Sequence, residues 1–185
     1  MPKHETASDR WFQERTRSFL NGRQTHKSLG FEYINNPPNY FADWSMCEWG
    51  TSGNRSVKGI AEYKRRQIPS TAKFVEREGI MVSAKKFAEA QKMCQIHDVI
   101  FQYFVEMKDG LFVYEESSFV NRGLAIPQRG VAKWRGDPND HNLVVMLDWD
   151  HFHKVCDVTE MDAYEASKKR ETQNEQGGNK VCRVS

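Results

Sequence analysis

The sequence predicts an α/β protein in which helices pack on a mixed central sheet. Three observations support this prediction: a helical segment near the N-terminus, a series of strand-like runs separated by turn signals, and a second helical segment before the last runs. Helix, strands, helix and further strands in this order are typical of a mixed sheet with packed helices. At 185 residues the chain has the size of one domain and is long enough for a substantial core.

Residues 8–21 are predicted to form the first helix, because apolar residues recur at helical spacing and Ser8 or Asp9 can cap the N-terminus. The Asn21-Gly22 pair is a plausible end of this helix. Runs rich in strand-forming residues and bounded by Pro or Gly turns then predict three strands, at 31–36, 40–49 and 57–66.

The second half of the chain is predicted to contain one helix, over 83–97 with Ser83 as its N-cap, and further strands. Lys108-Asp-Gly110 predicts a hairpin turn. The strands of this half are expected at 79–82, 99–107, 111–114 and 143–147, the last of them ending the sheet. We expect a single nuclease-like domain over 1–164 and a disordered polar tail over 165–185, where Gln, Asn, Gly and Lys dominate.

The composition favours a folded protein away from membranes. Hydrophobic residues make up 38% of the chain, with five Trp and eleven Phe, which is more than disordered chains carry. The N-terminus is polar and charged, and no apolar run approaches a membrane span. The four cysteines show no paired spacing for zinc or an iron–sulfur cluster, so free thiols in a reducing cytoplasm are the simplest expectation.

Positive charge is concentrated in residues 57–92, which hold nine Lys or Arg against four Glu although the whole chain has a net charge of +2. A local cluster of this kind is an expected footprint for nucleic acid. By itself it is equally typical of a solvated surface.

The residues that indicate chemistry are Asp43, Glu62 and Lys64. Successive side chains of a strand point to opposite faces, so Glu62 and Lys64 emerge on the same side of the 57–66 strand. Asp43 lies in the preceding strand-like run. Two carboxylates beside an ammonium suit a divalent cation and a positioned water. This combination predicts hydrolysis of a phosphodiester, although two surface carboxylates with a paired lysine would have the same pattern.

The pattern resembles the PD-(D/E)xK nuclease superfamily, with its restriction-endonuclease-like fold, and is most similar to small phage or Holliday-junction-resolvase-like members. The family order is a helix with an acidic residue, a strand with Asp, a strand with Glu-x-Lys, a helix with an early Lys and another strand. The matching residues, over about 8–116, are Glu14, Asp43, Glu62 with Lys64, and Lys86. One departure is Ala42, where the family name has Pro.

A second Glu-x-Lys tripeptide competes with the first. Glu106-Met-Lys108 ends a strand-like run, but Asp-Gly and a hairpin follow it. The family shows a basic stretch and a helix after its motif, as the chain has after Lys64. We therefore place the motif at 62–64.

The resemblance implies a role for each site residue. Asp43 and Glu62 would ligate Mg²⁺, which Mn²⁺ can replace, and the Tyr63 backbone carbonyl would complete the protein ligands. Lys64 would orient or help deprotonate the attacking water and stabilise charge on the phosphate. Glu14 would add a ligand or hold a metal-bound water, or else would only pair with a neighbouring Arg on its helix.

Five basic residues are predicted to contact the DNA backbone, or alternatively to lie on a solvated face: Arg65, Arg66, Lys73, Lys85 and Lys86.

Together these expectations describe a magnesium-dependent nuclease that hydrolyses DNA phosphodiester bonds through a metal-activated water. The resemblance implies a role in phage or bacterial DNA processing, such as recombination, repair or junction resolution, in the bacterial or phage-infected cytoplasm. It also leaves a homodimer open, because branch resolvases cut paired strands symmetrically. The alternatives are a non-catalytic DNA-binding protein that retains the nuclease fold and a small phage protein that binds a host protein.

Overall fold

The computed structural model describes residues 6–23, 31–37, 40–50, 53–116, 128–131 and 141–178. The helices are α1 (Ala7–Gly22), α3 (Lys73–Glu78), α4 (Ala84–His97) and α5 (Val158–Gly178), with a 3-10 turn η1 (Trp149–His151). The strands are β1 (Phe31–Asn35), β2 (Trp44–Trp49), β3 (Arg55–Arg65), β4 (Ile80–Ser83), β5 (Ile100–Met107), β6 (Gly110–Glu116), β7 (Gln128–Val131), β8 (His141–Leu147) and β9 (Phe152–Cys156).

The central sheet has six strands in the order β1-β2-β3-β5-β6-β9. β3 and β5 run parallel, and the other neighbours are antiparallel. A parallel pair needs a crossover connection, and here the segment with α3, β4 and α4 supplies it. A second, three-stranded sheet has the order β4-β8-β7. The predicted mixed sheet flanked by helices is therefore confirmed.

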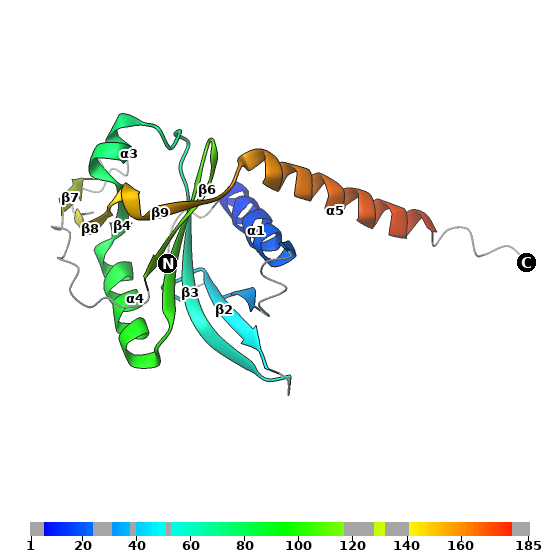
Figure 1. The fold of residues 1–185 in the computed structure, drawn as a ribbon, viewed down its shortest axis with the longest axis horizontal. Helices are drawn as coiled ribbons and strands as arrows, with labels where there is room; N and C mark the ends of the chain where they lie inside the picture. Colours follow the sequence, from blue (N-terminus) through cyan, green and yellow to red (C-terminus); the bar gives the residue numbers. More distant parts are fainter. Residues whose placement is uncertain are drawn as a thin grey trace, which may run out of the picture.

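The central sheet separates two hydrophobic clusters. On one face, α1 and α5 cover a cluster that includes Leu20, Trp44 and Met161, all fully buried. On the other face, α4 and the small sheet cover a cluster that includes Ala90 and Phe101 (Figure 1). Each fully buried aliphatic or aromatic side chain stabilises the fold by about 1.5–3 kcal/mol relative to an exposed one. Both faces of β3 are therefore buried from Gly59 to Tyr63.

α1 begins close to its predicted start but uses a different cap. The Thr6 side chain accepts a hydrogen bond from the Asp9 N–H at 3.1 Å, and Asp9 Oδ2 accepts one from the Thr6 N–H at 3.0 Å. This reciprocal pair is a capping box. Asp9 is thus the third helical residue and not the cap.

Gly79 ends α3 and leads the chain directly into β4. Its φ of +76° lies in the region that glycine adopts without strain. A Cβ atom at this position would lie 2.0 Å from the Leu147 carbonyl oxygen. Any side chain here would separate β4 from the end of β8.

Three predictions about the elements were wrong. The strand expected at 40–49 begins only at Trp44, so Asp43 stands just before it. The run at 143–147 is not the last strand, because β9 follows it and pairs with β6. The segment from residue 165, expected to be disordered, is helical up to Gly178 as part of α5, which extends away from the body of the molecule (Figure 1). None of the helices in the described ranges is long and apolar enough to cross a membrane.

Candidate active site

Asp43 immediately precedes β2 of the central sheet. The register places Trp44 opposite Ala61, so Asp43 comes level with Glu62 one residue further along. The Oδ2 atom of Asp43 accepts a hydrogen bond from the Tyr63 N–H at 2.8 Å. Asp43 and the Glu62-Tyr63-Lys64 motif therefore meet at the start of β2.

Tyr63 presents its backbone to this site and its side chain to the opposite face. The N–H and C=O groups of one strand residue point to the same side of the strand. Because the Tyr63 N–H faces Asp43, its carbonyl faces the same edge of β3, beyond the end of β2. The Tyr63 hydroxyl donates to Glu106 Oε2 at 2.7 Å in the other cluster. The ring thus anchors the residue whose carbonyl faces the site.

Glu62 is the central side chain of the site. It is 1% exposed, and its Oε1 atom lies 3.0 Å from Lys64 Nζ and 2.5 Å from Lys86 Nζ. Its other oxygen, Oε2, is buried and has no hydrogen-bond partner among the described residues. A buried polar atom without a partner costs about 1–3 kcal/mol, and more when it is charged. This oxygen is therefore available to a ligand.

The charges of the site perturb both titratable members of the motif. Burial raises the pKa of the Glu62 carboxyl; Lys64 opposes this rise, Asp43 adds to it and Lys86 opposes it. Desolvation lowers the pKa of the Lys64 ammonium, but the carboxylates of Glu62 and Asp43 outweigh it, so that this pKa is raised. Lys64 is consequently a cation at neutral pH.

The first turn of α4 brings one of its two adjacent lysines to the site. Lys86 reaches Glu62, with 35% of its side chain exposed, whereas Lys85 is exposed on the helix surface. Ser83 occupies the predicted N-cap position, but its side chain makes no capping hydrogen bond. β4 ends at Ser83 and α4 begins at Ala84, so the helix follows the strand directly.

The competing Glu-x-Lys tripeptide lies on the opposite face of the sheet. Both oxygens of the buried Glu106 are occupied: Oε1 accepts from Arg15 at 2.8 Å, and Oε2 accepts from Tyr63 at 2.7 Å and from Thr16 at 3.1 Å. Lys108 is exposed in the following turn. With its carboxylate saturated by donors, Glu106 has a structural role, which agrees with placing the motif at 62–64.

The predicted DNA-contacting residues divide between the two faces of β3. Arg65 shares the face of Tyr63, with its Nε 3.2 Å from Glu106 Oε1 and its guanidinium 3.4 Å from the centre of the Phe12 ring. Arg66 follows the strand on the face of Glu62 and Lys64, by the alternation of side chains. Lys73 is exposed at the start of α3. Arg65 is thus engaged inside the protein, while Arg66 lies on the side of the site.

Glu14 stands apart from the carboxylate pair. Its side chain contacts Arg17, three residues along the helix, and accepts from Asn35 Nδ2 at 3.3 Å. The hydrogen bond from Arg17 lowers the pKa of Glu14. The structure therefore places Glu14 in the helix-surface ion pair that the sequence analysis considered as its alternative role.

Asp43, Glu62 and the Tyr63 carbonyl form an oxygen donor set that fits Mg²⁺, which prefers hard ligands and keeps several waters. The unpartnered Oε2 of Glu62 is the observation that supports this fit. The described residues contain no cluster of three or more His, Cys, Asp or Glu side chains that could hold a metal. A metal at this site would thus depend on the backbone carbonyl and on water or substrate oxygens.

Sequence reasoning missed Asn36, which holds the loop that carries Asp43. The Asn36 N–H donates to the Asp43 carbonyl at 2.9 Å, its Nδ2 donates to the Ala42 carbonyl at 3.2 Å, and its Oδ1 accepts from Ser45 at 2.7 Å. An Asn before a Pro pair is a turn signal in the sequence. That signal was interpreted only as the end of a strand.

Comparison with protein families identifies one match. The family model described as phage putative PDDEXK endonuclease matches residues 1–155. This range contains α1, both strands of the motif and α4. Searches of curated proteins and of solved structures found no match.

Proposed function

Because the chain belongs to the phage PDDEXK endonuclease family, we propose that it is a magnesium-dependent endonuclease that hydrolyses DNA phosphodiester bonds at the Asp43–Glu62–Lys64 site. The observation that carries this proposal is the buried, unpartnered Oε2 of Glu62 beside Asp43. A carboxylate that served only to bind Lys64 and Lys86 would gain from exposing this oxygen or pairing it. The role would lie in phage DNA processing, such as recombination, repair or junction resolution.

The protein ligands would be Asp43, Glu62 and the carbonyl of Tyr63. Asp43 already uses Oδ2 to accept from the Tyr63 N–H, which fixes the carboxylate and leaves Oδ1 for a cation. When bound, Mg²⁺ would supply a Lewis acid for the phosphate and lower the pKa of a bound water, and Mn²⁺ would substitute for it.

Lys64 would act by its charge. Its raised pKa keeps it protonated, so in this state it is a hydrogen-bond donor and not a general base. With 42% of its side chain exposed, it can donate to the attacking water and to the phosphate oxygen where negative charge builds up. A donor aimed at charge that develops in the transition state typically contributes about 100- to 1000-fold to kcat.

The remaining basic residues near the site would hold the substrate. Lys86 neutralises Glu62 from α4 and can move to a phosphate once a cation neutralises that carboxylate. Arg66, Lys73 and Lys85 would bind DNA phosphates, which adds affinity without sequence selectivity. Arg65 does not join this group because Glu106 and Phe12 hold it on the other face.

The test is cleavage of plasmid, linear, single-stranded and four-way-junction DNA with Mg²⁺, Mn²⁺ or EDTA. We expect metal-dependent cutting that Glu62→Gln and Asp43→Asn abolish and that Lys64→Ala reduces by about 100-fold or more. Lys108→Ala is the matched control, because it removes the lysine of the second Glu-x-Lys tripeptide, and it should cut like the wild type. Light scattering on the same samples would test for a homodimer.

Two results would contradict the proposal. One is salt-sensitive DNA binding by the wild type without cutting in any metal, which would indicate a DNA-binding protein that retains the fold. The other is cutting that survives in both Glu62→Gln and Asp43→Asn, which would place the chemistry elsewhere.

A further inference from the structure

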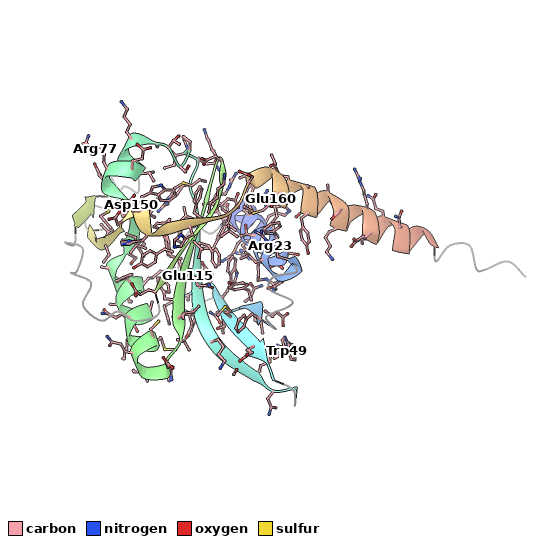
Figure 2. All side chains as sticks on the ribbon, viewed as in Figure 1. Arg23, Trp49, Arg77, Glu115, Asp150 and Glu160 are labelled. Atoms are coloured by element: carbon pink, nitrogen blue, oxygen red, sulfur yellow. The ribbon has the colours of Figure 1, made fainter. Side chains whose placement is uncertain are left out.

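Large exposed aromatic side chains in the described residues are Trp11, Tyr40 and Trp49. Trp49 stands at the far end of the β2–β3 hairpin (Figure 2), where the Arg55 guanidinium lies 4.0 Å from its ring centre and its Nε1 donates to Glu32 at 3.0 Å. One face of its ring and its N–H donor are therefore engaged within the protein.

Trp11 is also in contact with neighbouring side chains, and it lies on the sheet face opposite the candidate site. The Arg15 guanidinium lies 5.4 Å from its ring centre, and the Phe12 ring meets it edge-on at 4.7 Å. It belongs to α1, on the sheet face opposite Glu62. Tyr40 is the remaining exposed aromatic residue among those the structure describes.

Tyr40 lies beside the candidate metal ligands. Tyr40 is three positions before Asp43, so their Cα atoms are at most about 11 Å apart. Phe41 and Ala42, between them, pack into the cluster under α4, and this is the sheet face to which Glu62 points. Tyr40 therefore lies near the candidate metal ligands along the chain, with 39% of its surface exposed.

Tyr40 and the residues that follow it make hydrogen bonds to Pro37 and Asn36. The Tyr40 N–H donates to the Pro37 carbonyl at 2.9 Å. Asn36 closes the loop on both sides by donating to the carbonyls of Asp43 and Ala42.

Among the described residues, the Tyr40 ring contacts the ring of Phe41. It leans on the Phe41 ring, with 4.7 Å between the ring centres and 39° between the planes. No hydrogen bond of its hydroxyl to another described residue is found. An exposed aromatic ring is a surface on which nucleic acid bases stack, whatever their sequence.

We propose that Tyr40 stacks on an unpaired base next to the phosphate that is cut, so that the enzyme prefers DNA with single-stranded or unpaired nucleotides at the cleavage position. In an intact duplex, neighbouring bases cover both faces of each base, and only an unstacked base offers a face to a side chain. This inference rests on the proposed endonuclease function, because that function places the scissile phosphate at Asp43 and Glu62.

Binding and cleavage test the inference separately. One oligonucleotide with a single 2-aminopurine is used as a single strand and as a duplex, with Ca²⁺ in place of Mg²⁺ for the binding arm. We expect Tyr40→Ala to weaken single-strand binding on the order of 10-fold and to remove the 2-aminopurine signal of stacking, with duplex binding unchanged. Tyr40→Phe should retain both, and Tyr40→Leu should not.

The cleavage arm uses Mg²⁺ and the same variants. Tyr40→Ala should raise KM for the single strand on the order of 10-fold while kcat at saturation stays near that of the wild type. Trp49→Ala is the matched control: Trp49 is an exposed aromatic residue at the opposite end of β2 from Asp43, and its loss should change neither binding nor cleavage.

If Tyr40→Ala prefers the single strand over the duplex to the same degree as the wild type, the stacking role is overturned while the endonuclease function stands. If the wild type cuts no DNA, the endonuclease function fails. The 2-aminopurine signal still decides in that case whether Tyr40 stacks on an unpaired base.

Discussion

Glu62 and Glu106 head the two Glu-x-Lys tripeptides of this chain and lie on opposite faces of one sheet. Both are buried, at 1% and 2% exposure. Glu106 has donors on both oxygens, whereas Glu62 has two lysines on Oε1 and nothing on Oε2 among the described residues. The same three-residue pattern thus forms a saturated structural anchor in one place and an unsaturated ligand in the other.

Glu62→Gln should remove metal binding without unfolding the protein. The surroundings of Glu62 raise its pKa, so they disfavour its ionised form, and a neutral side chain of the same shape should be tolerated. We expect little loss in the free energy of unfolding without metal, and no stabilisation of the variant by Mg²⁺. Thermal melts with and without Mg²⁺ measure both, and a large loss of stability in the variant would argue for a structural role.

Glu106→Ala, in contrast, should lower the free energy of unfolding. It would leave the buried Arg15 with only the exposed Asp162 as a carboxylate partner, and breaking a buried ion pair on one side costs about 3–5 kcal/mol. Urea unfolding should show this loss, whereas Glu76→Ala, an exposed glutamate on α3, should change stability by less than about 0.5 kcal/mol. Similar midpoints for the two variants would mean that the Glu106 network does not stabilise the fold.

The buried cysteines should react slowly and with a steep pH dependence. Burial raises the pKa of the Cys94 and Cys156 thiols to about 11. Only the thiolate reacts with alkylating reagents, so at pH 8 their thiolate fraction should be about 100-fold below that of a thiol with an ordinary pKa of 9.0. Their labelling rate should rise about tenfold per pH unit below pH 11. Mass spectrometry of iodoacetamide-treated native protein measures this, and rapid labelling of Cys94 at pH 8 would show that α4 does not pack as described.

Stability should depend on the first turns of α5. Met161 is fully buried, and the Tyr164 ring meets Phe19 of α1 edge-on at 5.6 Å. Met161→Ala should therefore cost about 2–5 kcal/mol. Lys169→Ala, which removes only an exposed ion pair with Glu165, should cost less than about 1 kcal/mol. Equal unfolding midpoints would mean that α5 is not docked on α1.

The sequence predicted most elements of the first 116 residues because their patterns are local. The 83–97 helix is an example: its apolar arc includes Ala90 and Cys94, which are the buried residues of α4. The start of β2 was less predictable, because Tyr40 and Phe41 have strand-forming side chains but lie in a loop closed by Asn36. Tertiary hydrogen bonds, and not residue preferences, decide that boundary.

The C-terminal elements had weaker signals. β9 is an edge strand with His153 and Lys154 exposed, so little hydrophobic alternation marks it. In α5, burial is limited to the first turns around Met161, and residues 166–174 are exposed and mostly polar. A helix with so short an apolar contact has the composition of a disordered segment.

At the site, the pairing of Asp43 with the 62–64 motif followed from residue types and order, but the role of Arg65 did not. Strand alternation alone separates Arg65 from Glu62 and Lys64, yet its attachment depends on Glu106, 41 residues later in the chain. Such a partner is visible only once β3 and β5 are aligned.

The two faces of β3 have different roles, because Glu62 points to the site and Tyr63 points to Glu106. This difference restricts how the length of the chain can vary here. Loss of a single codon between Arg55 and Glu62 would shift the motif by one position relative to β5, turning the carboxylate ligand towards α1 and the Tyr63 ring towards α4. Point changes can be absorbed one side chain at a time, but an insertion or deletion here exchanges the two faces at once. We therefore expect length variation among natural variants in the turn after Trp49, and an invariant spacing from Gly59 to Lys64.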